Sequence, residues 1–211
     1  MLPTPDYRLT DKQKESVYDP AEDSFLLMDA IEKDLEAIKS INPRIAMEIG
    51  VGSGVISTFL AKALPSLSLL SLGTDVNADA CEAAKTTAEM NGVNLEVVRC
   101  DLVSAFLPRL AESIDILLFN PPYVPTDEEE VDASDLARCW AGGERGINTL
   151  QRLLPIVHHL LTIGGFFYLV ALRENGIEQL LTHSYRLRGS IVMERRAGIE
   201  YLYILKFERI L

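Results

Sequence analysis

The tetrapeptide Asn120-Pro121-Pro122-Tyr123 directly follows the apolar run 114–119, and this pairing constrains the fold more than any other feature of the chain. A run of that length and near-continuous apolar character predicts a strand buried on both faces, as in a parallel sheet covered by helices. The tetrapeptide would then lie at the carboxyl end of the strand, where open α/β sheets bind ligands. The sequence therefore predicts an α/β fold with a functional turn at this strand end.

The two prolines make this turn a rigid acceptor site. Because Pro122 has no backbone N–H, the Pro121 carbonyl and the Asn120 side chain lack a local donor. A planar NH2 group would satisfy both acceptors, and such groups occur on glutamine, asparagine, adenine and cytosine. We therefore expect Asn120, Pro121 and Tyr123 to act on the substrate, with Pro122 as part of the same substrate-binding turn. A tight turn that merely ends the strand is the alternative interpretation.

Apolar runs and helical periodicity alternate along the rest of the chain. We predict strands at 45–49, 67–74, 95–99, 114–119 and 166–172, and helices over 25–38, from 55, over 78–90, over 147–161 and over 177–185. Two β-rich runs, 190–196 and 200–207, are joined by a short turn and predict an antiparallel hairpin. The pattern indicates a doubly wound, mostly parallel, Rossmann-like sheet of seven strands with an antiparallel C-terminal hairpin.

The length of 211 residues is that of one α/β domain, which we place at residues 18–211. Residues 1–17 contain Pro3 and Pro5, show no periodicity and predict a flexible leader. The chain shows neither a signal segment nor an apolar run of the roughly 18 residues that span a bilayer. We therefore expect no membrane association and a location in the cytoplasm, or also in the nucleus.

Charge and cysteine usage limit the partners. The balance of 20 basic and 31 acidic residues gives a net charge of −11, which disfavours nucleic acid and favours a basic protein. Cys81, Cys100 and Cys139 are odd in number and widely spaced, so they predict a reducing compartment and neither a disulfide framework nor a Cys-x-x-Cys metal site. His158 and His159 are adjacent and would point about 100° apart on a helix, so we expect no metal.

A glycine-rich turn over 48–54 follows the first predicted strand. Gly50 and Gly52 would let a ligand approach the backbone, beside the free N–H groups of a helix N-terminus. The Gly-x-Gly-x-Gly spacing differs from the Gly-x-Gly-x-x-Gly of dinucleotide enzymes. Glu48 at the strand end would repel a pyrophosphate but suit a cation, so a sulfonium with an amino-acid tail fits this turn better.

Acidic residues also end the next two strands. Asp75, with the adjacent Val76, would accept both ribose hydroxyls of a nucleotide, which by itself does not separate NAD from S-adenosylmethionine. Asp101 would accept the adenine amino group, with Leu102 packed against the ring. Each carboxylate alone could instead be a helix cap or an exposed loop residue. Acids at three successive strand ends favour a nucleoside-containing cofactor.

These features together resemble a class I S-adenosylmethionine-dependent methyltransferase. More narrowly, segments 17–25 and 140–146 resemble the HemK-like protein glutamine methyltransferases, and most of all their short eukaryotic and archaeal branch, which lacks the N-terminal recognition domain of the bacterial branch. The resemblance implies N5-methylation of the Gly-Gly-Gln glutamine of a class 1 translation termination factor. It also implies a heterodimer with a small zinc-binding activator subunit. By position, Tyr18, Glu22 and Ser24 would line the methionine side of S-adenosylmethionine.

The expected chemistry is the orientation of a poor nucleophile. Asn120 Oδ1, at the boundary with the cofactor, and the Pro121 carbonyl would aim an amide nitrogen at the sulfonium methyl group. Such alignment accounts for roughly 7–11 kcal/mol of barrier in favourable cases. The two acceptors would also stabilise the positive charge that develops on nitrogen. No strong general base is evident, and we expect Tyr123 to cover the amide and exclude water.

Three other functions remain open from the sequence. Adenine-N6 DNA methyltransferases use the same acceptors on a flipped base. A protein lysine methyltransferase would use the acidic run 127–130 to attract basic peptide, although a solvated loop explains that run as well. A domain that binds S-adenosylmethionine only as a scaffold is the third. The apolar strand segment 67–72 is a candidate docking edge for the activator subunit, with core burial as the competing interpretation.

Overall fold

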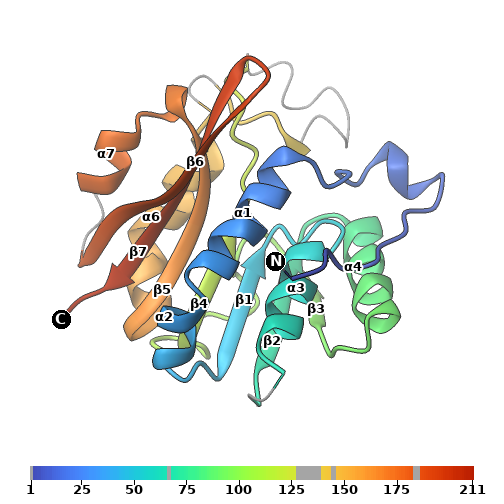
Figure 1. Cartoon of the computed structure of the whole chain (residues 1–211), viewed down its shortest axis with the longest axis horizontal. Coiled ribbons are helices and arrows are strands. Elements are labelled where there is room, and N and C mark those ends of the chain that lie inside the picture. The colour runs from blue at the N-terminus through green and yellow to red at the C-terminus, as the bar shows by residue number, and fades with distance from the viewer. Residues whose placement is uncertain (1, 66–67, 127–138, 144–145, 183–185) are drawn as a thin grey trace.

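The computed structural model describes residues 2–65, 68–126, 139–143, 146–182 and 186–211. Its centre is a seven-stranded sheet with the order β3-β2-β1-β4-β5-β7-β6 (Figure 1). The strands are β1 Ile45–Ile49, β2 Leu70–Asp75, β3 Glu96–Arg99, β4 Ile114–Phe119, β5 Leu161–Leu172, β6 Leu187–Ala197 and β7 Glu200–Arg209. All pairs from β3 to β5 are parallel, whereas β7 pairs antiparallel with β5 and β6. The expected doubly wound sheet with a C-terminal antiparallel hairpin is confirmed.

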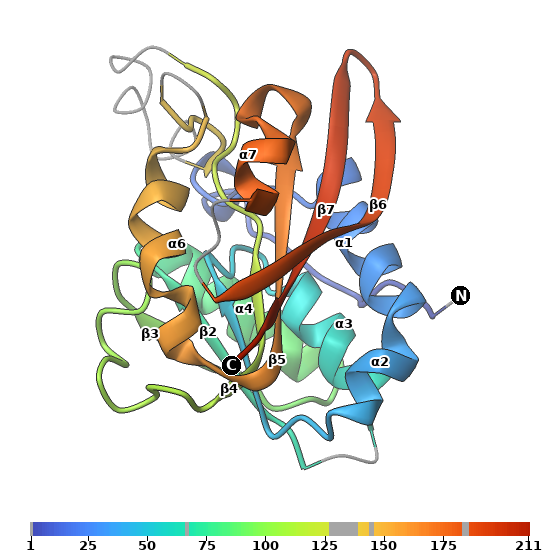
Figure 2. The same ribbon diagram turned by 90° about the vertical axis from the view of Figure 1, so that its left-hand side faces the viewer.

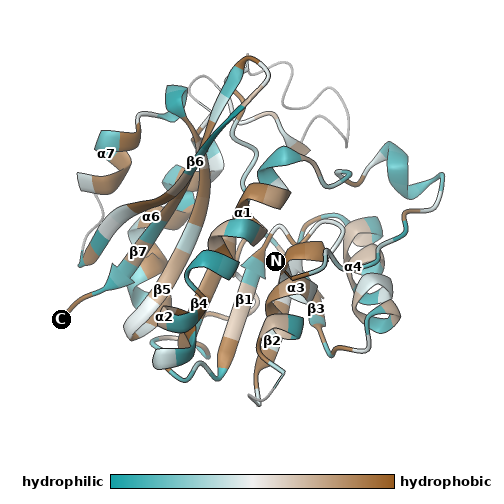
Figure 3. Ribbon diagram, viewed as in Figure 1, coloured by the Kyte–Doolittle hydropathy of each residue, from teal (hydrophilic) through white to brown (hydrophobic). Residues whose placement is uncertain are grey.

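Helices cover both faces of this sheet (Figure 2). They are α1 Glu22–Lys33, α2 Leu35–Ser40, α3 Val55–Ala63, α4 Ala78–Met90, α6 Asn148–Leu160 and α7 Ile177–Thr182, with short 3-10 turns η1 Gln13–Glu15 and η3 Arg173–Asn175. Figure 3 shows α3 and the central strands β4 and β5 as mainly apolar. Among the residues described, no helix is long and apolar enough to cross a membrane.

Alternate residues of the central strands belong to two hydrophobic clusters, one on each face of the sheet. Ile116 and Leu118 of β4 face α1, α2 and α3, whereas Leu117 and Phe119 face α6 and α7. All four side chains are at most 2% exposed. This double burial explains why the β4 sequence is apolar without a period of two, as expected for a parallel strand between two helical layers.

The site edge lies where the sheet reverses its winding. β1 pairs with β2 on one side and with β4 on the other, so the strand order turns back at β1 and leaves a crevice at the carboxyl ends. Ile49 pairs with both Thr74 and Phe119 at these ends. The glycine turn after β1, Asp75 of β2 and Asn120 after β4 therefore come to the same edge.

Several elements have other bounds than expected: β2 begins at Leu70 rather than 67, and β6 begins at Leu187 rather than 190. The N-terminal helix is broken into α1 and α2 at Asp34, whose side chain instead accepts hydrogen bonds from Tyr168 and Lys206 of the sheet. β5 begins at Leu161 rather than Phe166, because Leu161 already pairs with Ile114 and a register shift takes up the residues between Leu161 and Phe166, which pairs with Ile116. In the described part of the proposed docking edge 67–72, Leu70 and Ser71 pair with β1 alone and Leu72 pairs with both β1 and β3, so this docking edge stays a prediction. The free sheet edges are β3 and β6.

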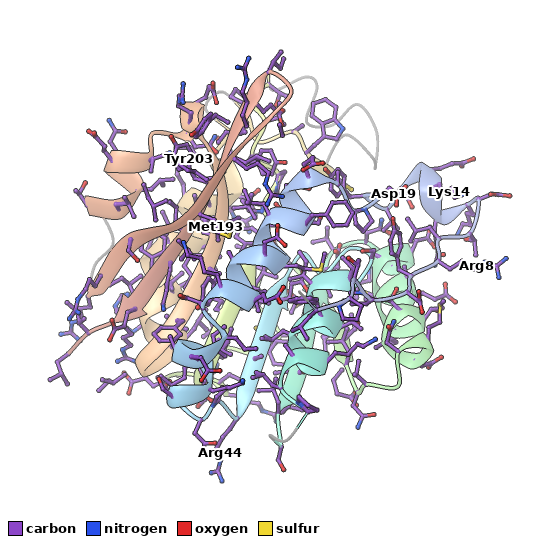
Figure 4. All side chains as sticks on the ribbon, in the orientation of Figure 1. Arg8, Lys14, Asp19, Arg44, Met193 and Tyr203 are labelled. Atoms are coloured by element: carbon purple, nitrogen blue, oxygen red, sulfur yellow. The ribbon has the colours of Figure 1, made fainter. Side chains whose placement is uncertain are left out.

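Residues 2–17 contact two helices of the domain: the Leu2 N–H donates to Glu32 of α1, and the later part of the segment lies along α4. Leu9 and Val17 are buried against Ala80 and Ala83 of that helix. Figure 4 labels Lys14 and Arg8 in this segment, both of which project outward. Isolated buried residues such as Leu9 produce no periodic apolar pattern, and for this reason the sequence of the segment predicts a flexible leader.

Candidate active site

A cavity of about 670 Å³ opens at the carboxyl edge of β1, β2 and β4. Its size is typical of small-molecule and cofactor sites. The residues expected to bind cofactor or substrate that line it are Tyr18, Ser24, Glu48, Gly50, Gly52, Asp75, Val76, Asp101, Leu102, Asn120, Pro121, Pro122 and Tyr123. Glu22 is the exception, since its largely exposed carboxylate lies outside the cavity lining, 3.8 Å from Arg195 Nη1.

The two polar side chains of the tetrapeptide converge on one carboxylate. Asn120 Nδ2 donates to Asp23 Oδ2 at 2.8 Å, and the Tyr123 hydroxyl donates to the same oxygen at 3.0 Å. Asp23 Oδ1 accepts from the Ser24 backbone N–H at 2.7 Å and from the Tyr18 hydroxyl at 3.2 Å. A buried carboxylate in the first turn of α1 thus joins the N-terminal motif to the turn after β4.

Sequence reasoning missed Asp23, which is 3% exposed. The signal was present, because Asp23 lies between two residues of the N-terminal motif that resembles the HemK-like enzymes. A carboxylate in the first helical turn is ordinarily explained by the helix dipole, so position alone did not single it out. Burial, and then the negative charge of Asp23, raise the pKa of Tyr18 and of Tyr123, so both phenols remain protonated donors.

Asn120 retains one unused acceptor. Its Oδ1 is buried and has no hydrogen-bond partner among the described residues. No hydrogen bond of the described backbone ends on the Pro121 carbonyl either. Since buried polar atoms are nearly always paired in folded proteins, an orphaned oxygen at the wall of a cavity marks a position for a donor on a ligand.

The backbone carbonyls of Pro122 and Tyr123 contact Asn175 and the glycines of the 140–146 segment. Asn175 Nδ2 donates to the Tyr123 carbonyl at 3.0 Å, and a Cβ on Gly146 would lie 1.9 Å from the same oxygen. A Cβ on Gly142 would lie 2.6 Å from the Pro122 carbonyl. The glycines of the 140–146 motif therefore allow this loop to pack directly on the turn. Trp140 lines the cavity and is 37% exposed, so it contributes to the site wall rather than to the core.

Glu48 is a buried carboxylate at the end of β1, only 2% exposed. Its Oε2 accepts from the backbone N–H of Ser57 at 2.9 Å and from the Ser57 hydroxyl. Burial raises the pKa of Glu48 to about 8, although the hydrogen bonds from Ser57 act in the opposite direction. The causes of this pKa shift include no cationic side chain of the described residues, so a positively charged ligand beside Glu48 would favour its charged form.

Asp75 is oriented by the backbone around it. Its Oδ2 accepts from the Gly52 N–H at 3.1 Å and its Oδ1 from the Asn77 N–H at 2.9 Å. Burial raises the pKa of Asp75, and these backbone bonds partly offset the effect. Each carboxylate oxygen has a second lone pair, so the group can still accept two hydroxyl donors from a ligand.

Asp101 is more exposed and already paired. Arg152 of α6 forms an ion pair with its Oδ2, and both side chains are more than half exposed at the cavity rim. Its neighbour Leu102 also lines the cavity. The acidic run 127–130 lies outside the described residues. No group of three or more His, Cys, Asp or Glu side chains in the described ranges is arranged to hold a metal ion.

The fold and this cavity define a class of protein. The sheet order, the glycine turn after β1, the acid at the end of β2 and the acceptor turn after β4 together define a Rossmann-like methyltransferase. The methyltransferase small domain model matches residues 21–136 of the chain.

Known proteins narrow this class. Human "Methyltransferase HEMK2" is 42% identical over 92% of this chain and 90% of its own length. The Schizosaccharomyces pombe "eRF1 methyltransferase catalytic subunit mtq2" is 38% identical over 100% of this chain and 97% of its own. The solved E. cuniculi Mtq2-Trm112 complex, described as responsible for methylation of the eRF1 translation termination factor, has a chain that superimposes with a TM-score of 0.68. That match is 27% identical and covers 92% of this chain and 99% of that chain. The chain belongs to the HEMK2 and mtq2 methyltransferase family.

Proposed function

We propose that this protein transfers a methyl group from S-adenosylmethionine to the side-chain nitrogen of the Gly-Gly-Gln glutamine in a class 1 translation termination factor. The observation that carries the proposal is the buried, unpartnered Oδ1 of Asn120 at the cavity wall. A glutamine amide has two N–H donors in one plane, and Asn120 Oδ1 and the Pro121 carbonyl are the two acceptors that fit them.

The cavity suits S-adenosylmethionine as the methyl donor. Glu48 supplies a carboxyl group whose charged form a cationic amino-acid moiety would favour, and Asp75 supplies acceptors for ribose hydroxyls. Gly50 and Gly52 have φ values of 64° and 51° and carry no side chain that would fill the space between these acids. When bound, S-adenosylmethionine supplies an electrophilic methyl group on a positively charged sulfur.

The chain's own residues supply orientation. Asn120 and the Pro121 carbonyl each accept one N–H, which fixes the amide plane and directs the nitrogen toward the methyl group. The nitrogen gains positive charge as its bond to the methyl carbon forms and the carbon–sulfur bond breaks, which would leave a neutral thioether, and the two oxygens stabilise the charge on nitrogen. One amide proton then leaves, so the product is neutral. Tyr123, 8% exposed, closes the wall beside the amide and limits access of water.

The substrate class is supported by the relatives and by charge. The S. pombe and E. cuniculi relatives are both named for action on eRF1. The net charge of −11 disfavours the adenine of a DNA duplex, although its planar NH2 group would suit the same acceptors. A lysine ammonium is tetrahedral and matches the paired acceptors less well than a planar amide does.

A small activator subunit of the Trm112 kind is the proposed partner, because the solved E. cuniculi relative is a complex with Trm112. In the described part of the sheet, β3 and β6 are the edge strands, so a partner strand could extend the sheet at either of them. We place the heterodimer in the cytoplasm, where termination factors act.

A methyl-transfer assay with labelled S-adenosylmethionine tests the proposal. The acceptors are a Gly-Gly-Gln termination factor, its Gln→Asn variant, DNA oligonucleotides and histone peptides, each with and without the activator subunit. We expect label on the factor with the intact Gly-Gly-Gln glutamine and on no other acceptor. Label on DNA or on histone lysine, with none on the factor, would assign the enzyme to one of the other acceptor classes.

A further inference from the structure

We propose that Asp23 is a positioning residue that fixes which atom of the Asn120 amide meets the substrate, and so makes the site select an NH2 group against a carboxylate. The inference rests on the proposed function, because the selected group is the glutamine amide. Asp23 lines the same cavity as Asn120 but makes its contacts through the opposite, protein-facing end of the Asn120 amide.

Asp23 is a buried acceptor surrounded by neutral donors. Its Oδ2 receives Asn120 Nδ2 at 2.8 Å and the Tyr123 hydroxyl at 3.0 Å. Its Oδ1 receives the Ser24 N–H at 2.7 Å and the Tyr18 hydroxyl at 3.2 Å. The hydrogen bonds that the described residues make to it come from an amide, phenols, a backbone N–H and the Ser24 hydroxyl, and none from a cation.

This arrangement dictates the orientation of Asn120. A carboxylate only accepts hydrogen bonds, whereas an asparagine amide has a donor end and an acceptor end of nearly equal shape. Turning the amide by 180° would set Oδ1 against Oδ2 of Asp23 and leave a buried carboxylate without one of its donors. A hydrogen bond to a charged group holds the observed orientation by about tenfold or more. Oδ1 of Asn120 is therefore the end left for the ligand, in agreement with its lack of a partner.

The two tyrosines also donate hydrogen bonds to Asp23 and accept none from it. Tyr18 and Tyr123 both donate to Asp23, and burial together with the charge of Asp23 raises their pKa values, so the phenols remain protonated. The Asn120 amide N–H and both phenols thus donate to Asp23, and Asn120 Oδ1 is left without a partner among the described residues. The two atoms assigned to the substrate, Asn120 Oδ1 and the Pro121 carbonyl, are both acceptors, and neither Pro121 nor Pro122 has an N–H to offer a substrate oxygen.

A carboxylate in place of the substrate amide would meet acceptors only. It would face Asn120 Oδ1 and the Pro121 carbonyl, with the charge of Asp23 behind them. The structure therefore assigns selection of glutamine against glutamate to the Asp23–Asn120 pair. This selection is lost if the Asn120 amide is free to turn.

The test uses the full chain with its activator subunit and four forms of the enzyme. These are wild type, Asp23→Asn, the exchange Asp23→Asn with Asn120→Asp, and the charge-matched control Asp29→Asn. Asp29 lies farther along α1 and pairs with Arg195 outside the cavity lining. For each form we measure kcat and KM for the termination factor, Kd for S-adenosylmethionine, and inhibition by the factor whose Gly-Gly-Gln glutamine is changed to glutamate.

In Asp23→Asn, the two amides can pair in either orientation. We expect kcat for the glutamine factor to fall about tenfold to a hundredfold, with Kd for the cofactor changed less than about threefold. We also expect the glutamate factor to inhibit about tenfold more strongly than it inhibits wild type, an effect that a loss of packing would not produce. The exchange variant again pairs one carboxylate, now at position 120, with one amide, now at position 23. Its kcat should therefore be about tenfold higher than that of Asp23→Asn. Asp29→Asn should match wild type.

Two results would overturn the role of Asp23. One is Asp23→Asn with wild-type kcat and unchanged inhibition by the glutamate factor. The other is an exchange variant that is folded, binds cofactor and is no faster than Asp23→Asn. If Asp23→Asn does not fold, the exchange variant is compared with wild type, and a folded, cofactor-binding exchange variant that is more than about a hundredfold slower than wild type overturns the role. Failure of the proposed function looks different, because wild type would then not label the factor at all, and the selection assigned to Asp23 would fall with it.

Discussion

The side-chain amide of Asn175 donates to the backbone carbonyl of Tyr123 at 3.0 Å, while its Oδ1 accepts the N–H of Leu172 at 2.7 Å. Asn175 is 2% exposed and comes from the 3-10 turn η3 after β5. A residue that is 52 positions away in the sequence thus fixes the last member of the acceptor turn. Both bonds are buried, so neither is replaced by water when it is lost.

We therefore predict that Asn175→Ala lowers both stability and activity. Loss of two buried hydrogen bonds should lower the free energy of unfolding by about 2–4 kcal/mol, measured by urea denaturation. Methyl transfer should fall as the Tyr123 backbone loses its support. Asn175→Asp is the matched variant, since it keeps the acceptor for Leu172 but has no donor for Tyr123. Full activity in Asn175→Asp would show that this contact does not support the turn.

We also predict that Glu48 makes the affinity for S-adenosylmethionine depend on pH. Burial raises its pKa to about 8, so the carboxyl is protonated in the free enzyme at neutral pH. A cationic ligand beside it favours the charged form, and S-adenosylmethionine affinity should rise with pH up to about 8 and then level off. Calorimetry from pH 6 to pH 9 measures this. In Glu48→Gln the affinity should be weaker and the slope should disappear; an unchanged slope in that variant would assign it to another group.

The raised pKa of Glu48 should also make the stability of the ligand-free protein depend on pH, which checks the pKa shift independently of cofactor binding. The pKa of Glu48 in the folded, ligand-free protein lies above its ordinary value of 4.5. Its contribution is therefore fully present below pH 4.5 and is lost as the pH rises toward about 8, by about 1.4 kcal/mol per pH unit at most. Glu48→Gln should remove this loss, so the ligand-free variant should unfold at a higher temperature than wild type at pH 8.

Asp75 provides the third prediction. With each oxygen already oriented by a backbone N–H, the carboxylate is poised to accept two ribose hydroxyls. Asp75→Ala should weaken S-adenosylmethionine binding by about tenfold to a hundredfold, as expected for hydrogen bonds to a charged group. Glu82→Gln, an exposed acid on α4, is the control and should bind like wild type. Equal dissociation constants for Asp75→Ala and wild type would count against the ribose assignment.

The fourth prediction separates two roles of Asp101. Its ion pair with Arg152 is exposed at the cavity rim and should be worth at most about 1 kcal/mol. Arg152→Ala should therefore change cofactor affinity less than about fivefold. If Asp101 accepts the adenine amino group, Asp101→Ala should weaken binding more than Arg152→Ala does. Equal effects of the two substitutions would mean that the pair shapes the rim and that Asp101 does not bind the cofactor.

Local patterns predicted most of the fold. The run 114–119 became β4 and the periodic segment 78–90 became α4, each with the expected bounds, because burial and caps leave a signal within a few residues. The break at Asp34 and the early start of β5 escaped prediction. Both depend on contacts with segments far away in the sequence, such as the bonds from Tyr168 and Lys206 to Asp34.

The sequence predicts most of the residues that line the site but not the hydrogen bonds between them. The strand-end rule brings Glu48, Asp75 and Asn120 to one edge without any coordinates. It says nothing of Asp23 or Asn175, which reach the acceptor turn from α1 and η3 across 97 and 52 residues. It also does not separate Glu22, outside the cavity, from its neighbours on the same helical turn, because that separation depends on which way the first turn of α1 faces.

The assignment of Asn120 Oδ1 as an acceptor for the substrate amide is tested by single-turnover methyl transfer with Asn120→Ala, measured beside S-adenosylmethionine binding by the same variant. Removing the unpartnered oxygen should slow transfer to the termination factor by at least about a hundredfold, as removal of one charge-stabilising group does in other enzymes. The dissociation constant of the cofactor should change by less than about threefold. Transfer at the wild-type rate by a folded, cofactor-binding Asn120→Ala protein would contradict the account.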